Sequence, residues 1–346
     1  TFFQLLTKTS SEASKNKTDA NIGMAKIPDD RIDFLSAIYN PKKITYATIE
    51  VTDIQGIQPT GSSEKGSSAS RFLESVRQVD ALVHVVRAFN DDSIFHTEGE
   101  IDPLRDIEII NMELLFADLA VIENRIHRIE TSKKITKENE KELDLLKKCR
   151  ACLENEELIY NMELTDEENE FLKTFNFLTE RPLILLMNLD DDQFVSSEYY
   201  HKEEVMDYVK EKHIPIIEVC AKLELEISEL EEEDRMIFMK DLGIEVTGTS
   251  KLASVAYDLL GLISFLTVGE DEVRAWPIKK GSTAKEAGGK IHSDIARGFI
   301  RAEVTKFAEF VEHGSMQKLK EKGLARLEGK ESIVEDGDMI NFRFNV

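Results

Sequence analysis

The 346-residue sequence lacks several features that define whole classes of protein. No run of about 18 or more apolar residues occurs, so we expect no membrane-spanning helix. Three cysteines, Cys149, Cys152 and Cys220, are too few for a disulfide framework and suit the reducing cytoplasm. The 44 Lys and Arg residues are outnumbered by 67 Asp and Glu residues, and the resulting net charge of −23 argues against broad, nonspecific binding of nucleic acid.

The shortage of basic residues is confined to one part of the chain. Residues 265–346 contain 14 basic and 14 acidic residues, so this segment is neutral and the whole negative excess precedes it. This shift predicts a domain boundary near residue 265. It also makes the C-terminal segment the better candidate for contact with an anionic partner.

What the sequence does contain is a set of four short apolar segments that each end in polar residues. They are residues 43–51, 81–86, 183–187 and 214–219. Runs of this kind are typical of strands buried on both faces of a parallel sheet. Ligands of such sheets bind beyond the carboxyl ends of the strands, so the four polar clusters predict one binding crevice.

A long charged stretch separates the second apolar segment from the third. Residues 102–131 and 137–157 carry apolar side chains at helical spacing, with a polar break between them, which predicts an antiparallel helical hairpin. Its Lys and Glu runs are interpreted as a solvated face. Cys149 and Cys152 form a lone C-x-x-C within this hairpin and are interpreted as ordinary helix residues, because nothing nearby completes a zinc site. From Glu272 onward, short strands around one amphipathic stretch predict a small α+β module.

One of the polar clusters is a D-x-x-G element, Asp53-Ile54-Gln55-Gly56. In nucleotide hydrolases, such a carboxylate reaches Mg²⁺, usually through water, and the glycine N–H approaches the γ-phosphate. The pattern also arises by chance in ordinary turns, so it predicts little alone.

Two further clusters follow later apolar segments in the order that a nucleotide-binding sheet requires. Asn188 and Asp191 form an N-x-x-D element that is similar to the N-K-x-D base reader, with Leu189 in place of the lysine. Cys220-Ala221-Lys222 is similar to the S-A-K element, whose backbone N–H contacts the base. Three elements in the correct order favour a nucleotide site far more strongly than one does.

The sequence contains no G-x-x-x-x-G-K-[ST] phosphate-binding loop. Residues Thr1–Thr7 look like the helix that follows such a loop. We therefore expect this sequence to begin immediately after the missing loop.

Longer strings give the chain a family resemblance. The segments 72–89, 107–114, 272–276, 290–294, 298–303 and 341–346 resemble the YchF, or Obg-like ATPase, family along essentially the whole chain. The resemblance implies an α/β fold in three parts. These are a Ras-like P-loop NTPase domain with a mainly parallel sheet at residues 1–101 and 179–264, a helical coiled-coil insertion at 102–178, and a C-terminal α+β TGS domain of ubiquitin-like β-grasp type at 265–346.

The same resemblance implies a Mg²⁺-dependent ATPase that associates with the ribosome, or with ribosomal RNA and protein, through its TGS domain as a regulator of translation or stress. Ile57 stands where related hydrolases carry a catalytic glutamine, and His96 matches the histidine that the family uses instead. Thr18 is the candidate Mg²⁺ ligand, although the short segment around it leaves its register open.

Two alternatives are kept. The first is a GTPase of the same family: Asp191 and Lys222 favour GTP, whereas Leu189 and the family resemblance favour ATP. The second is a nucleotide-gated ribosome-binding module with negligible turnover, which the altered loop at residues 61–70 and the absent glutamine favour.

Overall fold

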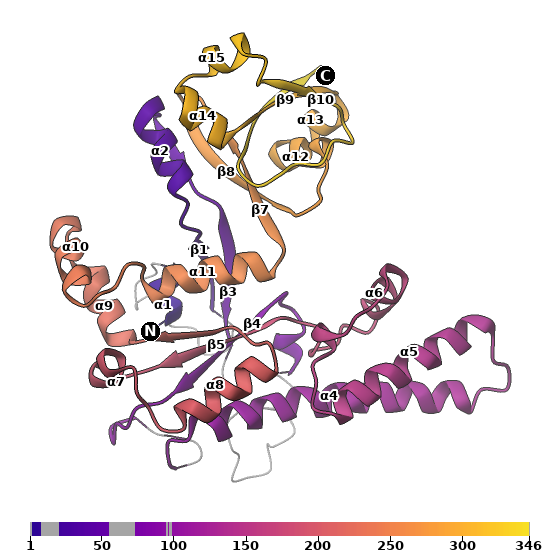
Figure 1. Ribbon diagram of the computed structural model, residues 1–346. Coiled ribbons are helices and arrows are strands. Elements are labelled where there is room, and N and C mark those ends of the chain that lie inside the picture. Colours follow the sequence, from indigo (N-terminus) through magenta and orange to yellow (C-terminus); the bar gives the residue numbers. More distant parts are fainter. Residues whose placement is uncertain (1, 8–20, 55–72, 95, 97–98, 346) are drawn as a thin grey trace. The chain divides into compact units, whose positions relative to one another are not determined.

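The computed structural model describes residues 2–7, 21–54, 73–94, 96 and 99–345 (Figure 1). The chain divides into two compact units, each of which is described by itself. The first unit covers residues 52–248 with a few residues nearer the N-terminus, and the second covers residues 22–51 and 249–346 with a few more. Among the described helices, none combines the length and the apolar character needed to cross a membrane.

The first unit is built on a parallel sheet in the order β4-β5-β6. Its strands are β4 (Leu82–Arg87), β5 (Leu183–Asn188) and β6 (Ile216–Val219). The central strand β5 is buried along its length up to Met187, as a strand covered on both faces must be. A parallel sheet of the predicted strands at 81–86, 183–187 and 214–219 is therefore confirmed. The prediction that residues 43–51 form a fourth strand of it is wrong: the run is interrupted at Tyr46 and Ala47, and its two halves, β2 (Lys43–Thr45) and β3 (Thr48–Asp53), belong to two other sheets. Strand β4 differs, because Val83 and Val85 are exposed, and β5 is the only strand that pairs with β4 within the described part of the chain.

Helices follow the strands of this sheet, and α8 shows how they are held. Val205 and Val209 of α8 are buried against Leu185 and Met187 of β5 in one hydrophobic cluster. The elements between β5 and β6 are α7 (Asp191–Ser196) and α8 (Lys202–Glu211). Those after β6 are α9 (Ala221–Glu229) and α10 (Glu232–Asp241). Helix α11 (Gly248–Leu259) follows them and belongs to the second unit from Thr249 onward.

The predicted helical hairpin is present between β4 and β5 (Figure 1). It consists of α4 (Pro103–Glu130) and α5 (Lys137–Glu154), followed by η2 (Ile159–Asn161) and α6 (Asp166–Leu172). Asp102 caps α4 and Pro103 occupies its first turn, where its missing N–H costs nothing. Cys149 is buried in the apolar seam of the hairpin, as expected of an ordinary helix residue.

A buried carboxylate joins this hairpin to the chain that leads back into the sheet. Asp118 of α4 accepts hydrogen bonds from the backbone N–H groups of Leu178 (3.0 Å) and Thr179 (2.8 Å) and from the Thr179 hydroxyl (2.8 Å). Burial raises the pKa of Asp118 even so. These contacts fix where the chain leaves the hairpin for β5.

The second unit contains a mixed sheet in the order β10-β9-β11-β7-β8-β2. Its strands are β2 (Lys43–Thr45), β7 (Leu262–Thr267), β8 (Glu272–Lys279), β9 (Phe299–Lys306), β10 (Arg326–Glu328) and β11 (Asp338–Phe344). Its helices are α2 (Asp30–Tyr39), α12 (Ala284–Ile291), α13 (Ser293–Arg297), α14 (Phe307–His313) and α15 (Met316–Glu321). The predicted C-terminal α+β module is therefore present, and β2 from early in the sequence pairs in parallel with β8 at its edge.

Two hydrophobic clusters hold this sheet. One joins Phe265 and Ile340 of the sheet to Ala287 of α12. The other joins Leu266 and Met339 to Leu35 of α2. Successive residues 265 and 266 belong to different clusters because side chains alternate between the faces of a strand.

The remaining described elements lie near the N-terminus. Helix α1 (Phe2–Thr7) is short, and β1 (Asn21–Lys26) and β3 (Thr48–Asp53) form a two-stranded sheet. The compact units do not decide the predicted domain limits of 1–101 with 179–264, 102–178 and 265–346, which stay predictions.

Candidate nucleotide-binding site

The register of the parallel sheet brings two of the predicted polar clusters together. Asn188 at the end of β5 pairs with Val219 at the end of β6. The next residue, Leu189, donates its backbone N–H to the Val219 carbonyl at 2.8 Å. The loops that leave these two strands therefore begin side by side at the carboxyl end of the sheet.

Side-chain contacts connect the two loops. The Ala221 N–H donates to Asn188 Oδ1 at 3.2 Å, and the Cys220 thiol donates to Asp191 Oδ1 at 3.2 Å. Lys222 forms an ion pair with the other oxygen of Asp191. The N-x-x-D and S-A-K-like elements, 29 residues apart from Asp191 to Cys220, thus form one polar cluster.

The electrostatics of this cluster centre on Asp191, the first residue of α7. The hydrogen bond from Lys222 holds the pKa of Asp191 below its usual range, so the carboxylate is ionised at neutral pH. The positive end of α7 also favours that charge. Burial raises the pKa of the Cys220 thiol, which keeps the proton it donates. Because both side chains of the Lys222–Asp191 pair are exposed to solvent, the pair adds little stability, and a ligand can displace the lysine.

Leu189 lies apart from these polar groups. Its side chain is buried in the hydrophobic cluster of the first unit, together with Val86 and Tyr199. The loop after β5 is thereby anchored through Leu189 while Asn188 and Asp191 face the polar cluster. A contact between Leu189 and the base stays a prediction.

The predicted phosphate and metal residues are only partly within the described chain. Asp53 is the exposed last residue of β3. Gly56, Ile57 and Thr18 lie outside the described residues, as does the loop at 61–70. Among the described residues, no three His, Cys, Asp or Glu side chains gather in a way that could hold a metal ion.

His96 lies at the N-terminus of the hairpin. Its Nε2 atom is 3.0 Å from Oδ2 of Asp106, in the first turn of α4, and the two side chains are only 13% and 17% exposed. The other Asp106 oxygen accepts from Arg105 at 2.9 Å. His96 is therefore a partnered and mostly buried side chain. Its role in catalysis stays a prediction.

Sequence reasoning missed the residues that hold the His96 segment. Arg87, at the end of β4, donates to the carbonyls of Phe89 (2.9 Å), Asp91 (3.0 Å) and Ile94 (3.0 Å). One guanidinium thus folds the segment that leads from the sheet to His96. The helix-start signal at Asp102 could have placed Asp106 in a first turn near this segment, but no local pattern reveals the contacts of Arg87.

His84 of β4 is a second histidine near Asp106. Burial lowers the pKa of His84 to about 4, although the negative charge of Asp106 opposes this shift. The ring is therefore neutral at physiological pH. Its Nδ1 atom is buried without a hydrogen-bond partner among the described residues.

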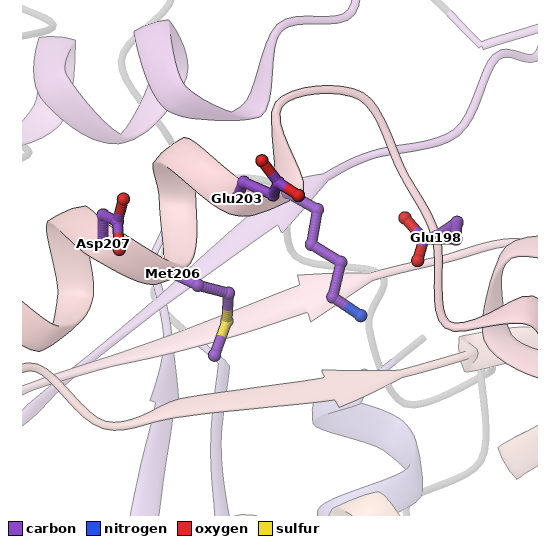
Figure 2. Close-up of a pocket in the computed structure, with 5 residues that line it drawn as sticks. Glu198, Glu203, Met206 and Asp207 are labelled. Carbon is purple, nitrogen blue, oxygen red and sulfur yellow. The ribbon is translucent and has the colours of Figure 1, made fainter.

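A hollow on the surface of the first unit lies beside α8 and holds none of the predicted site residues (Figure 2). It has a volume of about 450 Å³ and is lined by Glu198, Lys202, Glu203, Met206 and Asp207. Three carboxylates against one ammonium would repel a triphosphate, so the strand-end cluster is the better candidate site.

A parallel sheet whose strands end in these polar loops, with a helical hairpin inserted between β4 and β5, defines a Ras-like nucleotide-binding protein. Comparison with known proteins identifies the family. Residues 262–345 match the family model YchF-GTPase_C, described as "Protein of unknown function (DUF933)".

Relatives match along the whole chain. The chain is 41% identical to the ribosome-binding ATPase YchF of Bacillus subtilis over 354 residues, which covers 100% of this chain and 96% of the relative. It is 38% identical to the protein of the same name from Escherichia coli O157:H7 over 350 residues, with the same coverage. The structure of the Schizosaccharomyces pombe YchF GTPase superposes with a TM-score of 0.87 at 29% identity, covering 99% of this chain and 93% of that one. The chain belongs to the YchF family.

Proposed function

We propose that this chain binds and hydrolyses ATP with the help of Mg²⁺ and associates with the ribosome according to the nucleotide that it holds. The observation that carries the proposal is the meeting of Asn188, Asp191 and Ala221 at the carboxyl end of a parallel sheet. This cluster occurs in a chain that is 41% identical, along its whole length, to a protein named ribosome-binding ATPase.

Asp191 is the proposed base-contacting group. Asn188 is occupied in tying the loop of Ala221 to β5, so its role is to position that loop. The Asp191 carboxylate is ionised and partly exposed, and it can accept an N–H from a base once Lys222 moves aside. Cys220 would hold the other carboxylate oxygen in place through its thiol proton.

The choice between adenine and guanine follows from the same carboxylate. Guanine presents two N–H donors on one edge, which one carboxylate can accept together. Adenine presents one amine donor beside an acceptor, so the carboxylate gains one hydrogen bond at most. Residue 189 is a buried leucine, so this position carries no long cationic side chain that could pack on a guanine ring. Asp191 by itself thus favours guanine, whereas Leu189 and the relatives named ribosome-binding ATPase favour adenine. On the balance of these we propose ATP, with GTP as a weaker ligand.

Hydrolysis is assigned to His96. An imidazole can orient or deprotonate the attacking water, which is the role that Ile57 cannot fill with a hydrocarbon side chain. Asp106 acts as a positioning residue, because its bond to Nε2 fixes the orientation of the ring. Arg87 acts indirectly, because its hydrogen bonds to backbone carbonyls hold the segment that leads to His96.

Asp53 fits the proposed metal, because it is a carboxylate exposed at a strand end and Mg²⁺ prefers oxygen ligands. Bound Mg²⁺ would neutralise charge on the phosphates during transfer. Gly56 would place its N–H near the γ-phosphate, and Thr18 is the candidate second ligand.

The C-terminal TGS domain, at the proposed limits of 265–346, is the proposed ribosome-contacting part. Its equal numbers of acidic and basic residues weaken the long-range repulsion that the rest of this acidic chain exerts on RNA. A regulator of translation or stress in the cytoplasm is the cellular role that follows.

Phosphate release by the whole protein, measured with ATP and with GTP, in the presence and absence of ribosomes, tests the proposal. We expect ATP hydrolysis that ribosomes accelerate. Faster release from GTP would favour the GTPase alternative. Nucleotide-dependent ribosome binding without measurable release from either nucleotide would favour the gated binding module.

A further inference from the structure

Helix α10 lacks a buried side chain, as does the shorter helix α7. None of its residues from Glu232 to Asp241 is buried. Helices of this length are marginal in water unless tertiary packing of an apolar face stabilises them. Yet Met236 and Ile237 are 60% and 61% exposed at the centre of this helix. The helix thus presents Met236 and Ile237 to solvent, whereas Phe238 and Met239 are half-buried.

Acidic residues surround these two side chains. The segment from Glu224 to Asp241 contains eight acidic and two basic residues. The first-turn residues Glu232, Glu233 and Asp234 suit the positive end of the helix. Glu231 is the N-cap residue of α10 and also lies at this positive end, whereas Glu229 ends the preceding helix α9, where a negative charge is not favoured by the dipole. Among the described residues, Glu231, Glu233 and Asp234 form no ion pair, and only Glu232 is paired, with Arg235.

An occupant of this surface must therefore be apolar and basic. Anionic partners such as RNA are disfavoured, because their phosphates would approach a dense group of carboxylates. A protein segment that carries apolar anchors flanked by Lys or Arg satisfies both requirements. The apolar anchors would cover Met236 and Ile237, and the basic residues would pair with carboxylates that lack partners in the described chain.

We propose that α10 is a docking surface for a basic, amphipathic segment of a partner protein. The surface consists of Met236 and Ile237 with Glu231, Glu233 and Asp234. It lies outside the nucleotide cluster, and it requires neither ATP hydrolysis nor ribosome binding. The proposal therefore stands or falls independently of the proposed function.

The test uses the whole protein without nucleotide and a fluorescent peptide of about 18 residues, or about five helical turns, with Leu on one face and Lys on the other. The substitutions Met236→Ala and Ile237→Ala, made together, should weaken binding about 10-fold, which corresponds to about 1.4 kcal/mol. Alanine preserves the helix, and both side chains are exposed, so folding should not change. An oligolysine of the same length should bind at least about 10-fold more weakly than the peptide.

Two matched controls separate this surface from general attraction to an acidic protein. Ile109→Ala with Phe116→Ala removes exposed apolar side chains from another helix, α4, and should leave peptide affinity unchanged. Glu233→Gln with Asp234→Asn should weaken binding, whereas Glu138→Gln with Glu140→Gln, in the first turn of α5, should not.

Hydrogen exchange locates the contact. The peptide should protect backbone amides of residues 232–241. Equal losses in the α10 and α4 alanine variants, unchanged affinity in the α10 variants, or protection that spares residues 232–241 would each overturn the proposal. Direct binding of a labelled single-stranded RNA that protects residues 232–241 would also overturn it, because the surface would then accept an anion.

Discussion

The two compact units distribute their polar residues differently along their strands. In the first unit, β5 is apolar and buried from Leu183 to Met187, and its polar residues begin at its carboxyl end. In the second unit, β11 is buried over its first three residues and largely exposed after them, with Arg343 in the exposed part. Polar groups gathered at strand ends suit a small ligand in a crevice. Polar groups spread over a sheet face suit a large partner.

The net charges of the C-terminal segment and of the rest of the chain support the same division of roles. The neutral C-terminal segment can approach RNA, whereas the acidic remainder cannot do so without a local arrangement of cations. One chain can therefore place nucleotide chemistry and partner contact in different units. A sheet buried on both faces leaves polar groups only at its strand ends, and a sheet with an exposed face can contact a large partner there.

Removing a buried side chain from the parallel sheet should cost the most. Leu185→Ala in β5 deletes a fully buried side chain and should lower the free energy of unfolding by about 3 kcal/mol. Leu327→Ala, at an exposed position of β10, should change it by no more than about 0.5 kcal/mol. Urea unfolding followed by circular dichroism measures both. Similar losses of unfolding free energy in the two variants would mean that the two units do not differ in how these strands are buried.

Truncating the proposed catalytic histidine should affect turnover alone. His96→Ala should lower kcat about 100-fold and leave the Kd for ATP nearly unchanged, because the proposed contact is with the attacking water. Asp106→Asn keeps a hydrogen-bonding side chain but removes its charge and should lower kcat less. Phosphate release by the whole protein measures kcat, and equilibrium titration measures the Kd for ATP. If His96→Ala turns over as fast as the parent, His96 has no part in hydrolysis.

An arginine pair in the second unit should matter for the partner instead. Arg301 and Arg343 lie directly opposite each other on β9 and β11, although like charges in that arrangement are destabilising. Arg301→Ala with Arg343→Ala should weaken ribosome cosedimentation at low salt by about 10-fold and leave ATP hydrolysis without ribosomes unchanged. The exposed pair Lys280→Ala with Lys285→Ala serves as the control. Equal cosedimentation of the arginine variant and the parent would argue against this sheet face as the contact.

The smallest effect concerns the surface ion pair at the nucleotide cluster. Lys222→Ala removes the cation that competes for Asp191 and should raise GTP affinity more than ATP affinity, narrowing the preference for ATP by about 3-fold. Parallel titrations with both nucleotides measure the ratio. A wider preference for ATP would mean that Lys222 itself contacts guanine.

Local patterns predicted much of this molecule. The apolar run at 183–187 and its polar ending identified β5 and the loop of Asn188, because a buried strand requires consecutive apolar residues. The hairpin followed from helical spacing within a few residues of its observed limits.

The prediction that failed, a parallel-sheet strand at residues 43–51, and the contacts that were not predicted depend on distant parts of the chain. Strand β2 is three residues long and pairs with β8, so Lys43 faces Glu272 across 229 positions of sequence. Neither segment carries a local sequence pattern that predicts pairing with the other. The same limit hid the contacts of Asp106 with His96 and of Arg87 with the segment before His96.

The central claim is that the cluster of Asn188, Asp191 and Ala221 binds the base of ATP, and competition between nucleotides tests it most directly. A labelled ATP analogue bound to the whole protein is displaced by ATP and by GTP in separate titrations. The account predicts that ATP competes about 10-fold more tightly than GTP, a difference of about 1.4 kcal/mol, and that Asp191→Ala weakens both. Tighter competition by GTP, or unchanged affinities in Asp191→Ala, would contradict it.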